Sequence, residues 1–489
     1  MQRSIMVSRW FNTKMVCEEI TRAWCSSTST RRRTQRFVSV GIGLLAFFGV
    51  ARVFAADVSS HQKWVSTWAA SSQGPYPLGF PVAQPELRFA FPVPSSGATD
   101  QTFRLIVKPD LWGHRMRLQF ANVFGTQPVR FDEVFLGMQA SGGNLVPGTN
   151  LRVTFDAGKT GVTIAPGTRV YSDPVALSYV HNQTEPELSG RKLAVSFHVT
   201  GSTGPMTWHA KALQTSYLTS PNAGAHSQDE ADGAFLFTTT SWYFLDAIEV
   251  MAPEDTAVVA TFGDSITDGT ASTLNGDDRW PDFLSHRLHA AYGARVSVVN
   301  AAIGGNQILG PTTYTADSAA PGGPAALQRL DRDVLDLAGL TAVVWMEGIN
   351  DFGMSTTPQG TPAISADAVI LGFRTGVTRL HARGIKVIGG TLTSSLNSTA
   401  PHYGAPDVDA LRKAVNAFIR TGGEFDSVAD FDAATVDAAT GSLLPEFQPN
   451  STVGGPGDLI HPNRDGYMAM ANAVDIKMLA PSRKSVPAR

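Results

Sequence analysis

The second half of the chain alternates short apolar runs with longer amphipathic stretches. The apolar runs have the length of strands and are rich in β-branched residues, at residues 257–262, 295–299, 341–346 and a run ending at Thr391. The amphipathic stretches predict helices at residues 279–292, 325–337, 366–383, 408–420 and 466–478. Alternating buried strands and helices predict a parallel sheet with helices on both faces. We therefore expect a three-layer α/β/α fold in residues 254–480.

The stretch from Trp64 to about Val250 has a different pattern, with period two and frequent turns. Its clearest alternating runs are residues 103–107, 115–120 and 193–199, and turn clusters such as 140–144 and 165–167 separate them. Alternation of this kind is typical of half-buried antiparallel strands. We predict an antiparallel β-sandwich in residues 57–250, ahead of the α/β region.

Residues 1–55 form a leader of different composition. They hold nine Lys and Arg side chains against two Glu, while the whole chain of 489 residues has a formal net charge of −3, so the remainder is acidic. Basic residues 31–36 precede an apolar stretch, 37–50, and small residues follow at Ala55 and Ala56, the order of a signal peptide. An uncleaved membrane anchor is the alternative, but the stretch is shorter than the roughly 20 residues of a spanning helix. We predict a secreted or periplasmic protein that meets the membrane only through this signal.

Composition and missing motifs exclude several classes of function. Both cysteines, Cys17 and Cys25, lie in the leader, so the mature chain would hold neither a disulfide framework nor a cysteine nucleophile. Its acidic balance argues against nucleic acid as a partner. No Walker-type loop, H-E-x-x-H or Cys/His cluster occurs in the sequence, so we expect catalysis without a cofactor.

Residues suited to nucleophilic catalysis follow the predicted strands. Ser265 comes after the run 257–262, and a serine hydroxyl needs a base to become a nucleophile. His461 stands three residues after Asp458, so the carboxylate can accept from the imidazole Nδ1–H and leave Nε2 to face the serine. The G-x-S-x-G elbow is absent around Ser265, so its turn is of another kind.

Donors for a developing oxyanion are also present. Asn350 follows the strand 341–346 and would emerge at the same sheet edge as Ser265. Two glycines, Gly304 and Gly305, follow the strand 295–299, where a backbone amide can approach a ligand closely. The loop that comes next, residues 307–324, either lines the acyl pocket or is an ordinary surface loop.

The order of these residues resembles that of the SGNH (GDSL-type) hydrolase family, over about the last half of the chain. The resemblance implies a flavodoxin-like strand order and assigns catalytic roles to Ser265, Asp458 and His461. It also implies that the oxyanion donors are the N–H of Ser265, the N–H of Gly305 and the side chain of Asn350. In the family's pattern the donor glycine directly precedes Asn or Asp, and Gly305 precedes Asn306. The family includes lipases, carboxylesterases, lysophospholipases and carbohydrate O-deacetylases.

The leading hypothesis is a secreted serine esterase that hydrolyses small-molecule or polysaccharide esters. One alternative is a metal-dependent phosphoesterase, with Mg²⁺ held by Asp264, Asp268, Asp351 and Asp458. The competing interpretation of the first three carboxylates is that they bond turn amides beside the site.

The second alternative is a carbohydrate-binding or adhesive protein with an inactive hydrolase domain. Three aromatic residues are interpreted as part of the sandwich core, with a sugar-stacking platform as the less favoured alternative: Trp208, Trp242 and Tyr243. Four histidines of the same region lack a Ser/Asp partner in catalytic order and are interpreted as surface or packed residues: His114, His181, His198 and His209.

Overall fold

The apolar runs of the second half form a parallel sheet in the computed structural model, which describes residues 61–481. Its strands are β16 (Ala257–Gly263), β17 (Val296–Asn300), β18 (Leu340–Met346), β19 (Lys386–Gly390) and β20 (Ser427–Ala429). The strand order is β17-β16-β18-β19-β20, with every pairing parallel. This is the order 2-1-3-4-5 of flavodoxin-like sheets, in which ligands bind where the order reverses, beside the first strand. The carboxyl end of β16 is therefore the expected site.

Helices connect these strands. They are α1 (Ser265–Asp268), α2 (Trp280–Tyr292), α3 (Ala326–Leu330), α4 (Ile349–Gly353), α5 (Ala366–His381), α6 (Pro406–Thr421), α7 (Phe431–Thr435) and α8 (Arg464–Ala473). Short helical turns are η4 (Gly293–Arg295), η5 (Asp331–Leu335), η6 (Pro445–Phe447) and η7 (Ile476–Leu479). Alternate residues of β16 enter different cores: Ala260 packs in a cluster with Phe373 of α5, and Val259 in one with Leu284 of α2.

Two predicted helices are shorter than expected. The helix predicted over residues 325–337 ends at Leu330 and continues as the π-helical turn η5. This wider turn carries Asp333, which pairs with Arg329 inside the protein. The helix predicted over residues 466–478 ends at Ala473, because Val474 is extended.

Residues 61–253, which we call the sheet-rich region, form antiparallel strands. They are β1 (Gln62–Ala69), β2 (Thr99–Val107), β3 (Arg115–Ala121), β4 (Val129–Ser141), β5 (Asn144–Leu145), β6 (Leu151–Val153), β7 (Val162–Ile164), β8 (Arg169–Tyr171), β9 (Val175–Ala176), β10 (Leu193–Ser202), β11 (Trp208–His209), β12 (Ser216–Leu218), β13 (Phe237–Thr239), β14 (Trp242–Tyr243) and β15 (Leu245–Pro253), with turns η2 (Pro94–Ser96) and η3 (Pro186–Leu188). One sheet has the order β1-β15-β3-β8, a second β13-β12-β2-β10-β4-β5, and β11 pairs with β14. Phe120 of the first sheet packs edge-on against Phe197 of the second, so the two sheets share a core.

Of the two interpretations of the three aromatic residues, the core placement is confirmed and the sugar-stacking platform is wrong. Trp208, Trp242 and Tyr243 are buried, and Trp208 and Tyr243 pack against Tyr76. Their rings therefore belong to the core of the sheet-rich region and present no stacking surface to a sugar.

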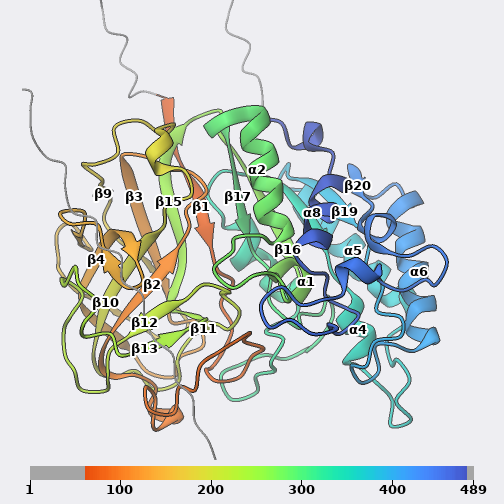
Figure 1. The fold of residues 1–489 in the computed structure, drawn as a ribbon, viewed down its shortest axis with the longest axis horizontal. Helices are drawn as coiled ribbons and strands as arrows, with labels where there is room; N and C mark the ends of the chain where they lie inside the picture. Colours follow the sequence, from red (N-terminus) through yellow and green to blue (C-terminus); the bar gives the residue numbers. More distant parts are fainter. Residues whose placement is uncertain (1–60, 482–489) are drawn as a thin grey trace, which may run out of the picture. The chain divides into compact units, whose positions relative to one another are not determined.

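Strand β1 joins the sheet-rich region to the parallel sheet. β1 lies beside β17 (Figure 1), and the Ser297 hydroxyl of β17 donates to the Ser66 carbonyl at 2.8 Å. The Ser66 N–H in turn donates to the carbonyl of Ala338 at 2.8 Å. These buried contacts cross the domain boundary that the sequence predicts near residue 250. That boundary therefore stays a prediction. The predicted leader lies outside the described residues.

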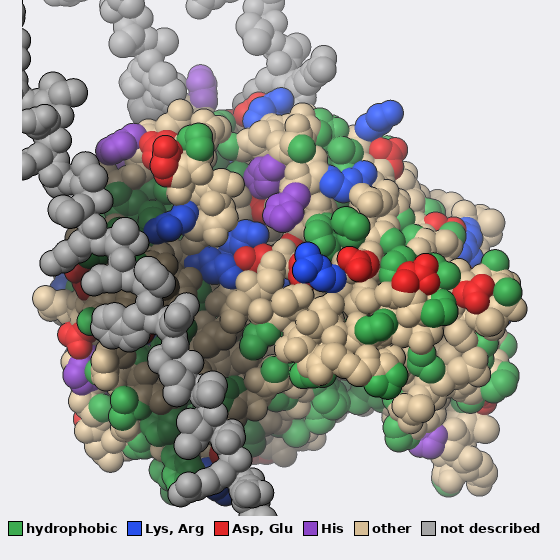
Figure 2. All heavy atoms as spheres, in the orientation of Figure 1, with side chains coloured by type: hydrophobic (Ala, Val, Ile, Leu, Met, Phe, Trp, Pro, Cys, Tyr) green, Lys and Arg blue, Asp and Glu red, His purple; other side chains and the backbone are tan. Residues whose placement is uncertain are grey.

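Surface charges of both signs are mixed. Figure 2 shows acidic and basic side chains side by side across the middle of one face. Exposed ion pairs include Arg374 with Glu424 and Arg379 with Asp331. Such pairs contribute about 0–1 kcal/mol each. Within residues 61–481, no helix is both long enough and apolar enough to cross a membrane.

Candidate active site

Ser265 lies where the central strand of the parallel sheet ends. β16 ends at Gly263, Asp264 caps α1 by accepting the N–H of Ile266 at 3.0 Å, and Ser265 is the first residue of that helix. The first N–H of a helix has no partner within the helix. Ser265 therefore offers a hydroxyl and a backbone N–H at the same edge of the sheet.

His461 and Asp458 lie near the C-terminal end of the α/β region in sequence, and they contact Ser265 in the fold. Ser265 Oγ lies 2.7 Å from Nε2 of His461, and Nδ1 of His461 lies 2.5 Å from Oδ2 of Asp458. The carboxylate accepts Nδ1–H, so the lone pair of Nε2 faces the serine hydroxyl. The structure brings together the three side chains that the sequence singled out.

Asp458 is held by backbone amides as well as by the imidazole. Its Oδ1 accepts the N–H of Ile460 at 3.0 Å and of His461 at 2.9 Å. Burial acts to raise its pKa, but the hydrogen bond and charge of His461 outweigh burial and hold the pKa well below the ordinary value. The carboxylate therefore stays ionised and orients the imidazole at neutral pH.

The two candidate donor glycines are distinguished by their hydrogen bonds. Gly304 donates its N–H to Oδ2 of Asp268 at 2.9 Å, so this amide is already engaged. Gly305 has a φ of +81°, and within residues 61–481 its N–H donates to no protein acceptor. Of the two amides, the one at Gly305 remains available to a ligand.

Asn350, in α4, has a fixed amide orientation. Its Nδ2 donates to the carbonyl of Asn306 at 2.9 Å, and its Oδ1 accepts the hydroxyl of Tyr403 at 2.7 Å. An amide nitrogen has two hydrogens, so one is left for a ligand. Tyr403 was not singled out in the sequence, because a tyrosine in a Gly/Pro-rich loop has no distinguishing pattern.

Three carboxylates bond turn amides beside the site, as the sequence indicated. Asp351 accepts the N–H of Ile308 at 2.8 Å and of Leu309 at 3.0 Å, while Asp264 and Asp268 bond the amides described above. Burial raises the pKa of Asp264 to about 7 and that of Asp351 to about 6. In the part of the chain that the structure describes, no group of three or more His, Cys, Asp or Glu side chains is arranged to hold a metal ion.

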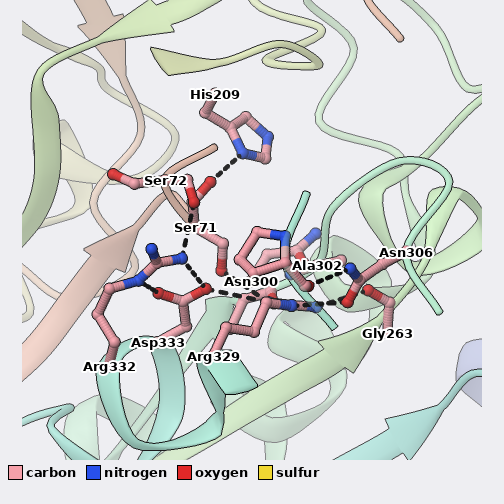
Figure 3. Close-up of polar contacts among 12 residues, drawn as sticks. Ser71, Ser72, His209, Gly263, Asn300, Ala302, Asn306, Arg329, Arg332 and Asp333 are labelled. Atoms are coloured by element: carbon pink, nitrogen blue, oxygen red, sulfur yellow. Dashed lines mark hydrogen bonds and ion pairs between the residues drawn. The ribbon is translucent and has the colours of Figure 1, made fainter. Parts of the chain in front are cut away.

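A buried arginine, Arg329, lies beside Gly263 and Asn306 (Figure 3). Arg329 donates to the carbonyls of Gly263 at 3.0 Å and Ala301 at 2.6 Å, and to Oδ1 of Asn306 at 2.7 Å. It also donates to Ser71 Oγ of the sheet-rich region at 3.1 Å and pairs with Asp333. One guanidinium therefore anchors the residues next to Asp264 and Gly305 to a second part of the fold.

The sheet-rich region reaches the site directly through three further side chains. The ring of Phe80, 40% exposed, lies against Gly305, and the amine end of Lys211 lies against Gly304. Nε2 of His209 lies 3.2 Å from Oδ1 of Asp268. No sequence pattern predicts these contacts, and His209 was interpreted only as a surface or packed histidine.

Comparison with known proteins gives a family match for part of the second half of the chain. The sequence model of the GDSL-like lipase/acylhydrolase family matches residues 261–469. The chain is similar to the lipase/acylhydrolase from Enterococcus faecalis, with 20% identity over 47% of this chain and 100% of that chain, at a TM-score of 0.33. It is also similar to a catalytic mutant of an acetylxylan esterase from Geobacillus stearothermophilus, with 20% identity over 47% of this chain and 97% of that chain, at a TM-score of 0.33.

A GDSL-like lipase from Bacteroides thetaiotaomicron is 19% identical over 46% of this chain and 88% of that chain, with a TM-score of 0.31. No curated protein matches the chain.

Proposed function

Residues 261–469 form a GDSL-like lipase/acylhydrolase domain, so the chain is a carboxylic ester hydrolase, and we propose that its acyl-enzyme forms on Ser265. The observation that carries this proposal is the 2.7 Å contact between Ser265 Oγ and His461 Nε2, backed by Asp458 at 2.5 Å from Nδ1. A hydroxyl, a base and an orienting carboxylate in this arrangement are the parts needed to activate a serine.

In the first half of the reaction, Ser265 Oγ attacks the ester carbonyl carbon and its proton passes to Nε2 of His461. The carbonyl oxygen becomes an oxyanion. It accepts hydrogen bonds from the N–H of Ser265, the N–H of Gly305 and the free N–H of Asn350. Each donor of this kind is worth about 2.7–4 kcal/mol of transition-state stabilisation. When the intermediate collapses, the bond to the alcohol oxygen breaks and the alcohol takes the proton from His461.

In the second half, water resolves the acyl-enzyme. His461 takes a proton from the water as its oxygen attacks the acyl carbon, and then returns that proton to Ser265 Oγ as the bond to the serine breaks. The products are a carboxylic acid and the free enzyme. Asp458 keeps its negative charge throughout and stabilises the imidazolium form of His461.

The proposed substrates are small-molecule or polysaccharide esters. Support comes from the sheet-rich region, which places the exposed aromatic ring of Phe80 against Gly305, where the ester carbonyl would bind. An exposed ring beside the reacting group can contact either a sugar face or the apolar part of an acyl group. Fold-level analogy with secreted enzymes that carry an accessory β region also favours a polysaccharide ester.

The wider organisation is part of the proposal. Residues 254–480 would form the catalytic domain as a three-layer α/β/α structure, preceded by a β-sandwich in residues 57–250. The basic and apolar leader, residues 1–55, supports export to a secreted or periplasmic location.

Hydrolysis of p-nitrophenyl esters from acetate to palmitate tests the proposal, with acetylated xylan assayed in parallel. We expect turnover that Ser265→Ala abolishes while the variant keeps the wild-type circular dichroism spectrum, and that EDTA leaves unchanged. Release confined to acetate and acetylated xylan would define a carbohydrate deacetylase, and a preference for longer chains a lipase-like esterase. Turnover that survives Ser265→Ala would overturn the assignment of the nucleophile.

A further inference from the structure

His209 is a buried histidine that links the sheet-rich region to the ester site. It lies in β11, only 4% exposed, and Nδ1 faces the carbonyl of Ser71 at 2.9 Å. Nε2 faces Oδ1 of Asp268 and the carbonyl of Lys211, each at 3.2 Å. Oxygens of this kind only accept hydrogen bonds, so both ring nitrogens donate. Burial acts to lower the pKa of His209, but the charge and hydrogen bond of Asp268 raise it above the ordinary value.

Asp268 connects His209 to the oxyanion side of the site. Its Oδ1 faces His209, and its Oδ2 accepts the N–H of Gly304 at 2.9 Å. Gly304 directly precedes Gly305, whose N–H is the proposed oxyanion donor. The direction of the Gly305 N–H is set by the peptide plane that joins these two residues. A change in Asp268 would therefore rotate or shift the donor.

Lys211 is a second buried basic residue beside Gly304, and burial lowers its pKa against the raising effect of Asp268. It is 3% exposed, its Nζ donates to Oγ1 of Thr270, and its charge interacts with Asp268. Cε of Lys211 lies 2.7 Å from where a Cβ of Gly304 would be. The glycine at position 304 thus leaves room for a lysine from the sheet-rich region.

We propose that His209 is a positioning residue for ester hydrolysis, which acts through Asp268 to fix the Gly304 amide and so aim the Gly305 N–H at the oxyanion. The inference rests on the proposed function, since it needs Gly305 to be an oxyanion donor. It gives the sheet-rich region a part in positioning the oxyanion donor, beyond any contact with the substrate.

A second histidine of the same region provides a matched control. His198, in β10, is 3% exposed and lies between two carboxylates, with Nδ1 at 2.7 Å from Asp132 and Nε2 at 3.1 Å from Asp100. All three residues belong to the sheet-rich region. Loss of His198 therefore removes a buried histidine and its two carboxylate contacts without touching Gly304.

The test compares steady-state hydrolysis of p-nitrophenyl acetate by four forms of the full chain: wild type, His209→Phe, His209→Gln and His198→Phe. We expect His209→Phe to lower kcat up to about 10²-fold with KM within twofold, because a misplaced catalytic group costs rate rather than binding. His209→Gln keeps an N–H near the position of Nε2 and should recover most of the loss. His198→Phe should leave kcat within twofold, although it lowers the melting temperature.

The possible outcomes separate this inference from the function it rests on. Without Ser265-dependent turnover by the wild type, the proposed function fails. When the wild type does show that turnover, two outcomes overturn the positioning role and leave the proposed function standing. One is an unchanged kcat in His209→Phe, and the other is an equal loss of kcat in His198→Phe. If His209→Phe does not fold, Asp268→Asn decides, because His209 and Gly304 bond different oxygens of Asp268 and asparagine keeps only one of the two positions as an acceptor. A wild-type kcat in Asp268→Asn would then overturn the inference.

Discussion

The hydroxyl of Tyr403 donates to Oδ1 of Asn350 at 2.7 Å, and this hydrogen bond determines which end of the Asn350 amide faces the ester site. With Oδ1 engaged by Tyr403, Nδ2 is directed toward the carbonyl of Asn306 and the place of the oxyanion. Tyr403 thereby sets the direction of a proposed donor.

Asn350→Ala should lower kcat by about 10²–10³-fold with little change in KM, because the donor acts mainly on the oxyanion. Tyr403→Phe should lower kcat less, since the amide remains but loses its orienting partner. Steady-state kinetics on p-nitrophenyl acetate checks both variants. Tyr292→Phe is the control, because its hydroxyl donates to the carbonyl of Ile476, away from the site. An effect of Asn350→Ala confined to KM would mean that Asn350 only binds substrate.

Asp458→Asn should lower kcat by about 10⁴-fold, since an amide can donate to Nδ1 and favour the wrong tautomer of His461. The fold should survive, because Oδ1 of the asparagine can still accept the amides of Ile460 and His461. Kinetics together with the circular dichroism spectrum checks this expectation. A variant within tenfold of wild-type kcat would contradict the role of Asp458.

Gly305→Ala should reduce both stability and activity. A φ of +81° costs a residue with a Cβ about 1–2 kcal/mol, and the new Cβ would lie 2.5 Å from the ring of Phe80. Urea unfolding and kcat are the measurements. Gly167→Ala is the matched control, because its φ is +74° and no atom lies within 4 Å of its Cβ position. Equal losses of activity in the two variants would show that Gly305 has no special part in catalysis.

Arg329→Lys should destabilise the protein strongly. The guanidinium donates to five protein acceptors, and an ammonium has only three hydrogens. Each buried acceptor left without a donor costs about 1–3 kcal/mol. Urea unfolding checks this, with Arg374→Lys as the control, since Arg374 forms an exposed pair with Glu424. A loss no greater than that of the control would show that the acceptors find other partners.

The pH dependence of stability should report the protonated state of His209. In the unfolded chain a histidine titrates near pH 6.5, while the folded-state pKa of His209 is raised. Between these values the folded state holds the extra proton, so increasing pH favours unfolding. The stability advantage of wild type over His209→Gln should be full below pH 6.5 and decline as pH rises through the folded-state pKa. Urea unfolding at several pH values checks the sign, and an advantage that grows with pH would contradict it.

Much of the parallel sheet was predictable because long, β-branched apolar runs are seldom anything but buried strands. β20 was missed, since its three residues, Ser427–Ala429, are too few to show a period. Ser265, Asn350 and His461 stood out because each follows a strand or has its partner nearby in sequence. Their order along the chain was therefore enough to form a hypothesis about the site.

The contributions of Phe80, His209 and Lys211 were not predictable. Periodicity tells which face of an element is buried, but it does not tell which loop of one region meets which loop of another. The same limit explains why the sequence left a sugar-stacking platform open as an alternative. Trp208 and Trp242 look the same in the sequence whether they lie in a core or on a binding surface. Such pairings become visible only when both regions are placed in space.

The hydrogen bond from Arg329 to Ser71 closes a loop of 258 residues. Contacts between positions so distant in the chain are slow to form, because a large loss of chain entropy precedes them. We therefore expect β16 and its helices to collapse early, and the residues that Arg329 anchors, Gly263 and Asn306, to settle only once β1 has docked. Hydrolytic competence would then be acquired at the end of folding, and a partly folded chain would carry the proposed nucleophile without being able to use it.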